Sequence, residues 1–312
     1  MQRVTLGKTG LNVARIGLGT WGMGGRWWGP VNDQQATLAI EEALDAGINF
    51  IDTADVYGFG HSETLLGKTL GARRKDIVLC SKVGLRWNNK GKVRHDLSPG
   101  HIFKAIDASL QRLQTDYLDV YFVHWPDPEV PVARTVAALQ KCVEAGKVRH
   151  LGFSNLSAKE MSAYREFAEF SVCQPPLNLF ERYAEVAMLP YCAQHNIGIA
   201  TYSPLCRGLL AGGLSADDEI KESVRKRDPL FHGATFHRNM SIVAQLKELA
   251  AAHDATVAQL AIAWVLTHHG IHLAICGARK PGQLQENVKV AEMQLEHQLL
   301  RDIDAILTTT PN

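Results

Sequence analysis

The chain has 312 residues, of which 46% are apolar, 21% charged and 7% aromatic. This is the composition of an ordinary globular protein, and it excludes collagen, coiled coil and intrinsic disorder. With 33 basic and 32 acidic residues the net charge is +1, so the charge balance does not predict a nucleic acid as partner. The length allows two average domains or one large α/β barrel.

The N-terminal residues carry charges, at Arg3 and Lys8, where a signal peptide needs an apolar stretch. The most apolar run, 258–266, is interrupted by Gln259 and is shorter than the roughly 20 residues that a bilayer requires. We therefore expect a cytoplasmic protein without a membrane partner. Six scattered cysteines are expected to be reduced, and the lack of ligand spacing predicts no metal site.

Apolar strand patterns alternate with amphipathic helical patterns along the chain. A short β-hairpin is predicted at 5–13, with its turn at Gly7-Lys8-Thr9-Gly10. Eight strand candidates follow, at residues 16–19, 48–52, 77–81, 118–124, 148–153, 172–174, 197–202 and 273–276. Helical patterns between and after them include residues 33–46, 99–113, 131–145, 185–195 and 240–252.

Eight strands, mostly separated by one helix, predict a parallel sheet. The strand sequences are nearly continuous apolar runs, as burial on both faces requires. A polar, charged insertion at 206–238 makes the gap before the last strand more than twice the usual length. Since no linker interrupts the chain, we expect one domain over 1–312, a (β/α)8 TIM barrel with an N-terminal β-hairpin and a long loop after strand 7. Its chemistry is expected at the carboxyl ends of the strands.

Residues 17–22 read GLGTWG and match the G-x-G-x-x-G fingerprint of dinucleotide-binding folds. That fingerprint needs a helix that begins at its third glycine and faces the pyrophosphate. The following residues, MGGRWWGP, cannot begin a helix, and the expected acidic residue would fall inside the helix at 33–46. We therefore reject a Rossmann fold; a nucleotide could still bind through other contacts.

Several strands end in polar groups that are costly to bury unless they are paired. These are Asp52, Lys82, His124 and the pair Ser154-Asn155, and Tyr57 follows five residues after Asp52. Each has an ordinary structural role when taken alone, such as a helix cap, a solvated lysine or a hydrogen-bonded core histidine. Their joint placement at one end of a barrel favours a shared site.

Together these groups suit the reduction of a carbonyl. A lysine ammonium near a tyrosine favours the phenolate and lowers the tyrosine pKa, and an aspartate keeps the lysine charged. A neutral histidine can donate a hydrogen bond to the substrate oxygen. Because no side chain here is a reductant, a hydride-bearing cofactor is implied.

The segments around these residues resemble the aldo-keto reductases. They read FIDTADVYG at 50–58, SK at 81–82, VHWP at 123–126 and GFSN at 152–155, and the resemblance extends from Gly7 to the C-terminal helix. QPPLN at 174–178, YSPL at 202–205 and GARKP at 277–281 resemble a bacterial branch that handles sugar-type and small hydroxy-aldehydes. The resemblance implies a tetrad without substitution, with Tyr57 as general acid, Lys82 and Asp52 tuning it, and His124 orienting the carbonyl.

The same resemblance implies that NADP(H) is the cofactor. Ser154, Asn155 and Gln174 would hold the carboxamide, and Tyr202 would stack on the nicotinamide ring. The residues that would follow the pyrophosphate are Ser203, Pro204, Leu205, Cys206, Arg207 and Gly208. Gly19, Thr20, Trp21 and Asp52 are also expected to line the cofactor.

After the last strand, Gly277, Ala278 and Arg279 precede Pro281, which is predicted to open a helix and so an anion site. By resemblance, Arg279 and Gln283 read the 2′-phosphate and Asn287 contacts the adenine. Gln283 stands where relatives in other branches carry a second basic residue, so the strength of the NADP preference stays open.

Five of the six tryptophans fall in predicted loops after strands, whereas Trp264 is expected in the core. They suggest an aromatic pocket for aldehydes or the C–H faces of sugars. The residues expected in it are Trp21, Trp28, Phe59, Trp87 and Trp125. The insertion is either a loop that closes over the cofactor or a surface excursion.

The sequence thus predicts an NADPH-dependent reductase of small aldehydes and ketones that is a monomer or a weak homo-oligomer. The same site run in reverse is an NADP-dependent sugar or polyol dehydrogenase. A third interpretation is a cofactor-binding regulatory subunit of an ion channel, a role that the family includes. A metal-dependent hydrolase is disfavoured because the strands end in Lys82, Ser154 and Gln174, which are poor metal ligands as a group.

Overall fold

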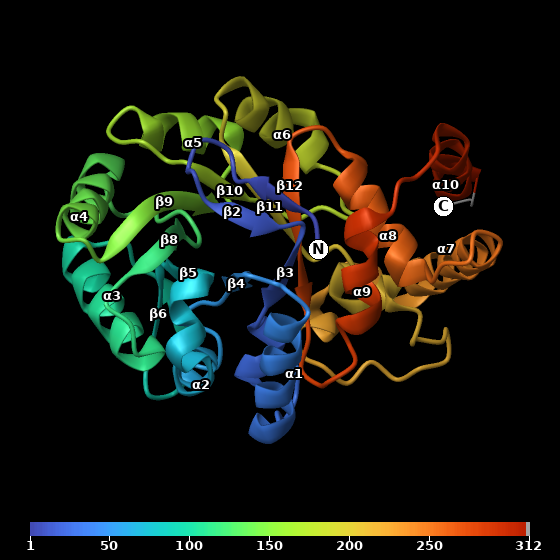
Figure 1. Cartoon of the computed structure of the whole chain (residues 1–312), viewed down its shortest axis with the longest axis horizontal. Coiled ribbons are helices and arrows are strands. Elements are labelled where there is room, and N and C mark those ends of the chain that lie inside the picture. Colours follow the sequence, from blue (N-terminus) through green and yellow to red (C-terminus); the bar gives the residue numbers. More distant parts are fainter. Residues whose placement is uncertain (310–312) are drawn as a thin grey trace.

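A computed structural model describes residues 1–309 and shows eight parallel strands closed into a barrel (Figure 1). The strands succeed one another around the barrel in chain order. They are β3 (Ile16–Gly19), β4 (Phe50–Asp52), β5 (Val78–Val83), β8 (Leu118–Val123), β9 (Val148–Ser154), β10 (Val172–Gln174), β11 (Gly198–Tyr202) and β12 (Ile271–Gly277). The prediction of a (β/α)8 barrel is confirmed; the last three residues of the predicted domain, 310–312, lie outside the described part of the chain.

Helices surround the barrel and bury their apolar faces against its outer wall (Figure 1). Their bounds are α1 (Asp33–Asp45), α2 (His61–Leu70), α3 (Pro99–Leu113), α4 (Val132–Glu144), α5 (Ala158–Arg165), α6 (Ala184–Gln194), α7 (Gly233–Ala251), α8 (Val257–Thr267), α9 (Gln285–Lys289) and α10 (His297–Thr309). Local sequence fixes several starts: Ser157 and Thr256 form capping boxes, and Ser98 caps α3 just before Pro99. Trp264 is 3% exposed on α8, as expected of a core residue.

The predicted N-terminal hairpin is present as antiparallel strands β1 (Arg3–Thr5) and β2 (Asn12–Ala14). It lies across the opening of the barrel that faces the viewer in Figure 1. Leu6 and Val13 are fully buried in one cluster with Phe50 and Phe122, which belong to barrel strands. The hairpin therefore closes the amino-terminal end of the barrel and leaves chemistry to the other end.

The region after β11 differs from its prediction. Helix α7 begins at Gly233 rather than at residue 240, and the insertion before it holds three short 3-10 helices, η3 (Cys206–Ala211), η4 (Arg225–Arg227) and η5 (Pro229–Phe231). The first turns of α7 look polar in sequence, but Phe236 and Asn239 are buried there. Tertiary packing therefore extends the helix beyond what its sequence pattern indicates.

Two further segments, one after β5 and one after β12, differ from the prediction. Strands β6 (Leu85–Trp87) and β7 (Val93–His95) form a small antiparallel hairpin after β5 that the sequence did not predict. Pro281 lies in a turn and does not open a helix; α9 begins only at Gln285. Gly282 has a φ of +82°, a left-handed conformation that interrupts any helix started at Pro281. Within residues 1–309, no helix is long and apolar enough to cross a membrane.

Candidate active site

The candidate site is the last layer of inward-facing side chains at the carboxyl end of the barrel. Phe50 of β4 and Cys80 of β5 lie in the apolar cluster inside the barrel. Asp52 follows Phe50 by two residues, and Lys82 follows Cys80 by two residues. Because side chains alternate along a strand, residues two apart point the same way. The same alternation at the ends of β8 to β11 gives His124, Ser154, Gln174 and Tyr202. An apolar barrel interior thus ends in a layer of polar groups.

Lys82 is the centre of this layer and is fully buried. Its Nζ donates to Asp52 Oδ1 at 2.7 Å, to Asp52 Oδ2 at 2.8 Å and to the Thr53 carbonyl oxygen at 2.8 Å. It also lies 3.1 Å from the hydroxyl oxygen of Tyr57. Gln174 Nε2 donates to Asp52 Oδ1 at 2.7 Å, so the carboxylate is held from two sides. The buried ion pair is therefore hydrogen-bonded as such a pair must be.

Burial and charge act in opposite directions on the pKa values of the tetrad. Burial is the largest single influence on the pKa of Lys82 and lowers it, but Asp52 and Tyr57 together outweigh burial, and the Lys82 pKa lies above its usual value. Burial raises the pKa of Tyr57 to about 12, although Lys82 acts to lower it. Lys82 thus acts in the direction expected from the sequence, but the expected net depression of the Tyr57 pKa is wrong. Tyr57 keeps its proton at neutral pH, as a proton donor must.

His124 completes the tetrad and is 7% exposed. Its ring packs edge-on against Tyr57, with centroids 5.8 Å apart and planes at 79°. Burial, with Lys82 and His95, lowers the pKa of His124 well below its usual value, so the ring is neutral. Nδ1 is buried and has no hydrogen-bond partner among the described residues. A proton on Nδ1 would be an unpaired buried donor, which places the N–H of the neutral ring at Nε2.

The four residues expected to hold a carboxamide and a flat ring lie together. Tyr202 donates its hydroxyl to Asn155 Oδ1 at 2.7 Å, and Asn155 Nδ2 donates to the His124 carbonyl at 2.9 Å. Ser154 Oγ donates to the Gln174 carbonyl at 3.3 Å. Asn155 takes up this position with a φ of +57°, a left-handed conformation that asparagine tolerates. Amide and hydroxyl groups beside an aromatic ring match the donor set that a nicotinamide requires.

The segment expected to follow the pyrophosphate turns sharply after β11. Ser203, Cys206 and Arg207 have φ values of +55°, +46° and +52°, and Gly208 has +94°. Such a run of left-handed residues is strained and turns peptide groups toward one side, as anion-binding loops do. Cys206 is fully buried, so its thiol does not face the site. Pro204 is buried and Leu205 half-buried in the same turn.

Arg207 does not offer a free charge to this segment. Its NH1 lies 2.9 Å from Glu181 Oε2, and its Nε pairs with Asp228. Asn178 holds the same turn from below, because its Nδ2 donates to the Ser203 carbonyl at 3.0 Å. Two carboxylates therefore already balance the cation that the sequence suggested for the pyrophosphate.

A glycine leaves space at the end of β12, next to β3, whereas a Cβ at Gly19 on β3 would come within 2.9 Å of the Ile275 side chain. Gly277 pairs directly with Gly19 across the two strands, and a Cβ at Gly277 would meet only the Gly19 carbonyl, at 3.8 Å. Ala278 beside them is buried. Thr20 departs from its expected role: it is fully buried, and its Oγ1 donates to the Asp52 carbonyl at 3.0 Å and accepts from Ser62. Its hydroxyl therefore stabilises the barrel wall and does not reach the site.

The predicted 2′-phosphate residues are held by protein groups. Arg279 NH1 donates to the Trp28 carbonyl at 2.8 Å, so its side chain reaches back toward the aromatic loop. Gln283 Oε1 accepts the backbone N–H groups of Arg279 at 2.7 Å and Lys280 at 3.0 Å. Asn287 is 5% exposed on the five-residue helix α9. Gln283 therefore fixes the turn, and Arg279 and Lys280 are the two cations that the turn carries.

Most of the predicted aromatic pocket lies in one cluster beside Tyr57. Trp21 packs against Trp28 with centroids 5.3 Å apart and against Tyr57 at 6.2 Å. Phe59 stacks on Trp87 at 5.0 Å with planes 7° apart. Trp27 joins the same cluster against Phe59 at 6.0 Å, a contact that the sequence did not single out.

Trp125 stands apart from this cluster. It is 41% exposed, and its ring lies 6.4 Å from the ring of His95, a residue of the β6–β7 hairpin. Trp125, which the sequence predicted in the aromatic pocket, therefore lies at the outer edge of the site.

The insertion after β11 reaches the loop that carries Trp27 and Trp28. Val224 N–H and Ser223 Oγ both donate to the Trp27 carbonyl, at 3.2 and 3.3 Å. Arg225 Nε donates to the Arg207 carbonyl at 2.9 Å, and its guanidinium lies 5.6 Å from the Trp28 ring. The insertion is thus joined to the loop after β3 at the carboxyl end of the barrel.

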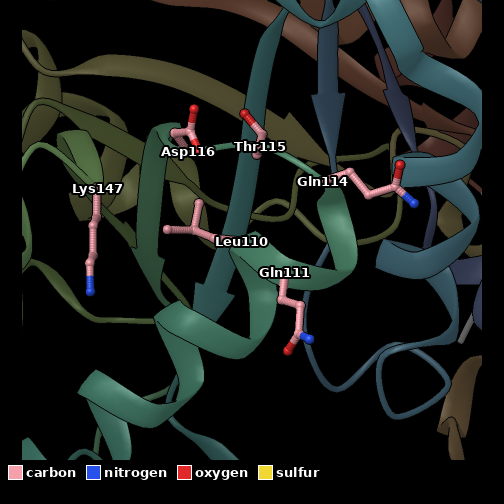
Figure 2. A pocket seen from close by; sticks show the side chains of 6 residues that line it. All are labelled: Leu110, Gln111, Gln114, Thr115, Asp116 and Lys147. Carbon is pink, nitrogen blue, oxygen red and sulfur yellow. The ribbon is translucent and has the colours of Figure 1, made fainter.

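A surface depression at the other end of the barrel takes no part in this arrangement. It lies between the end of α3 and the start of β9, and Figure 2 shows Leu110, Gln111 and Lys147 among its lining residues. Helix α3 ends there just before strand β8 begins, and Lys147 directly precedes β9, so the depression lies at the amino-terminal end of the barrel. None of the residues that line it belongs to the candidate site.

The geometry can be compared with known proteins. A model of the Aldo/keto reductase family matches residues 15–308. The chain belongs to this family. Aldo-keto reductase YhdN of Bacillus subtilis is 40% identical over 99% of this chain and 95% of its own length. The NADH-specific methylglyoxal reductase of Escherichia coli is 34% identical over 98% of this chain and 97% of its own length.

A solved structure shows the same fold. The glycerol dehydrogenase AKR11B4 from Gluconobacter oxydans superposes with a TM-score of 0.89 and 38% sequence identity, covering 96% of this chain and 93% of that chain. As an aldo/keto reductase, the chain is an oxidoreductase that works with a nicotinamide cofactor. Within residues 1–309, no group of three or more His, Cys, Asp or Glu side chains is arranged to hold a metal ion.

Proposed function

We propose that this aldo/keto reductase reduces aldehydes and ketones to alcohols with NADPH, with Tyr57 as the proton donor. The observation that carries the proposal is the 3.1 Å contact between Lys82 Nζ and the Tyr57 hydroxyl, backed by the buried pair of Lys82 with Asp52. A charged lysine held against a buried tyrosine hydroxyl is the arrangement that a proton donor requires.

Each tetrad residue then has a defined task. When bound, the reduced nicotinamide supplies a hydride to the carbonyl carbon. The Tyr57 O–H donates its proton to the carbonyl oxygen, which completes the alcohol and leaves a phenolate. The Lys82 ammonium stabilises that phenolate, and Asp52 keeps Lys82 charged and in place. His124 donates from Nε2 to the same oxygen as negative charge develops there.

Ser154, Asn155 and Gln174 are proposed to hold the carboxamide, and Tyr202 to lie against the ring. Gly277, which pairs with Gly19 and at which a Cβ would meet only the Gly19 carbonyl, would leave room for the cofactor backbone at these strand ends. Arg279 and its neighbour Lys280 support NADPH over NADH, because two cations at one turn suit a 2′-phosphate. One 34% identical relative is NADH-specific, so the choice of cofactor depends on residues such as these rather than on the family.

The reverse reaction is the second candidate. The similarity to a glycerol dehydrogenase from Gluconobacter oxydans supports oxidation of a polyol at the same site. In that direction Tyr57 accepts the proton of the alcohol, and the Lys82 ammonium favours the phenolate that must do so. Both directions use the same residues, and the chain is proposed to act as a single barrel domain.

The decisive assay measures oxidation of NADPH and NADH by the purified protein with glyceraldehyde, methylglyoxal and butanal, and reduction of NADP⁺ with glycerol. The proposal expects reduction with NADPH at a kcat/KM well above that with NADH. Turnover confined to glycerol and NADP⁺ would favour the dehydrogenase. Tight NADPH binding without turnover of any substrate would favour a regulatory role.

A further inference from the structure

The β6–β7 hairpin presents two different faces at the rim of the site. Leu85, Trp87 and Val93 on its inner face pack into the cluster that contains Tyr57 and Phe59. The hairpin is therefore attached directly to the residues that surround the reacting hydroxyl. This placement makes its charge relevant to whatever approaches Tyr57.

The outer face carries an unusual pairing. Arg86 and Arg94 lie directly opposite each other across the two strands. Like charges in that position destabilise a two-stranded sheet, so neutral or opposite charges would be better for folding alone. Such a local conflict is expected where function requires it.

One carboxylate offsets these arginines, and it is already fully engaged. Asp96 Oδ2 lies 3.3 Å from Arg86 NH1 and 4.0 Å from Arg94 NH2. Asp96 Oδ1 accepts the N–H and hydroxyl of Ser98, at 3.1 and 2.6 Å. The arginine side chains stay largely exposed, 54% for Arg86 and 67% for Arg94.

The rest of the hairpin adds cations and no acid. Lys90 and Lys92 stand exposed at its tip, and residues 85–95 contain no Asp or Glu in a chain whose net charge is only +1. Arg26 joins them from the β3–α1 loop: its guanidinium covers the Phe59 ring at 4.3 Å and donates to the Gly91 carbonyl at 3.4 Å. Five cations therefore meet at one edge of the site.

The hairpin is also tied to the opposite side of the rim. His95 Nδ1 lies 2.7 Å from the Pro126 carbonyl, in the loop that follows β8 and His124. Its charges are thus held in place between Phe59 on one side and Trp125-Pro126 on the other. A fixed positive rim beside an opening attracts anions and increases their rate of arrival.

We propose that the β6–β7 hairpin selects carbonyl substrates that carry a negative charge, a carboxylate or a phosphate, by attracting them to the site. This inference rests on the proposed function, because it names the substrate class for the same Tyr57 chemistry. The attraction is long-range, so it acts on the association step and is weakened by salt.

The test compares matched pairs of substrates that differ in one anionic group. Succinic semialdehyde is paired with butanal, and glyceraldehyde 3-phosphate with glyceraldehyde, at saturating NADPH. The ratio of kcat/KM within each pair cancels any effect of salt on cofactor binding. We expect this ratio to fall about fivefold or more when ionic strength rises from about 0.02 M to about 0.3 M.

The variant Lys90→Glu/Lys92→Glu reverses the charge at the tip without removing any hydrogen bond of these side chains among the described residues. We expect it to reduce the same ratio by about tenfold at low salt, with butanal turnover unchanged. The matched control is Lys75→Glu/Lys141→Glu, two exposed lysines in segments that lead into β5 and β9 at the amino-terminal end. The control should leave the ratio unchanged.

A second measurement needs no turnover. Quenching of tryptophan fluorescence by iodide, relative to neutral acrylamide, reports positive potential near the aromatic cluster of the site. We expect the Lys90→Glu/Lys92→Glu variant to lose iodide quenching and the control variant to keep it. Equal ratios and equal iodide quenching in the wild type and both variants would overturn the inference. Absence of turnover with an intact iodide difference would instead count against the proposed function.

Discussion

The ammonium nitrogen of Lys82 lies 3.1 Å from the hydroxyl oxygen of Tyr57, at the carboxyl end of a closed barrel. Burial raises the pKa of Tyr57 to about 12 while Lys82 acts against that rise. The Tyr57 hydroxyl therefore keeps its proton in the resting site and donates it once negative charge develops on a substrate oxygen. Asp52 is needed because a lone lysine at this depth would lose its charge.

Replacing Lys82 with methionine should impair both folding and catalysis. The substitution leaves the Asp52 carboxylate buried without its cation, which destabilises a protein by roughly 3–5 kcal/mol. Reduction should fall by about 100-fold or more because the phenolate of Tyr57 is no longer stabilised. Urea unfolding and NADPH oxidation measure the two effects.

The double variant Asp52→Asn/Lys82→Met separates them. It removes both charges and should recover most of the lost stability without recovering activity. A double variant as unstable as Lys82→Met alone would show that the ion pair is not the origin of the loss.

The rate of reduction should depend little on pH around neutrality. Since the pKa of Tyr57 is raised to about 12, the donor stays protonated through neutral and mildly alkaline pH. Burial also holds the pKa of His124 well below its usual value, so no acidic loss from its protonation is expected near pH 6.5. Profiles of kcat/KM between about pH 6 and about pH 9 should be nearly flat. A steep fall with an apparent pKa near 7 would contradict this assignment.

Tyr57 should also make stability depend on alkaline pH. Unfolded tyrosine loses its proton near pH 10, whereas folded Tyr57 keeps it until about pH 12. The folded state therefore binds more protons in this interval, and stability decreases as pH rises through it, by about 2–3 kcal/mol in full. The difference in unfolding free energy between the wild type and Tyr57→Phe isolates this effect. A difference that does not change above pH 10 would contradict the raised pKa.

Replacing Arg279 with alanine should weaken NADPH more than NADH. We expect a loss of about 10- to 100-fold for NADPH, the worth of a charge-assisted contact to a phosphate, and a small loss for NADH. Titration followed by tryptophan fluorescence measures both affinities, with Lys75→Ala, an exposed lysine at the amino-terminal end of the barrel, as the control for general charge. Equal losses for the two nucleotides would remove Arg279 from the 2′-phosphate and leave only its bond to the Trp28 carbonyl.

Replacing Arg225 with alanine should loosen the insertion. The variant loses the hydrogen bond to the Arg207 carbonyl and the packing of the guanidinium near Trp28. We expect faster cleavage within residues 206–232 by a protease and faster release of NADPH, if this segment closes over the cofactor. Lys221→Ala, in the same segment, is the control. Unchanged cleavage and release rates would make the insertion a packed surface element without a role in binding.

The barrel could be predicted because its strands carry their own signal. Each is a nearly continuous apolar run, and the predicted bounds of β3 and β10 match the observed ones. The tetrad could be predicted because a lysine or aspartate directly after such a run is costly to bury unless it is paired. Burial of these groups in one layer follows from the two-residue alternation along the strands.

Other features depend on contacts that no local pattern contains. The β6–β7 hairpin has strands of only three residues, too short for a clear strand pattern. Its apolar inner face is covered only by the tertiary contact with the cluster that contains Phe59. Arg279 was expected at the 2′-phosphate, and the sequence did not indicate that its guanidinium donates to the carbonyl of Trp28, 251 residues earlier in the chain. The pKa of Tyr57 depends on the balance between burial, which raises it, and Lys82, which lowers it. The sequence alone does not give the size of either effect.

The central claim is that Tyr57 delivers the proton during NADPH-dependent reduction, and the variant Tyr57→Phe tests it most directly. The variant removes one hydroxyl and keeps the ring that packs between Trp21 and His124. Reduction of glyceraldehyde and binding of NADPH are measured on the same preparations. We predict a loss of activity of about 1,000-fold or more with NADPH binding unchanged. Activity close to that of the wild type would contradict the account.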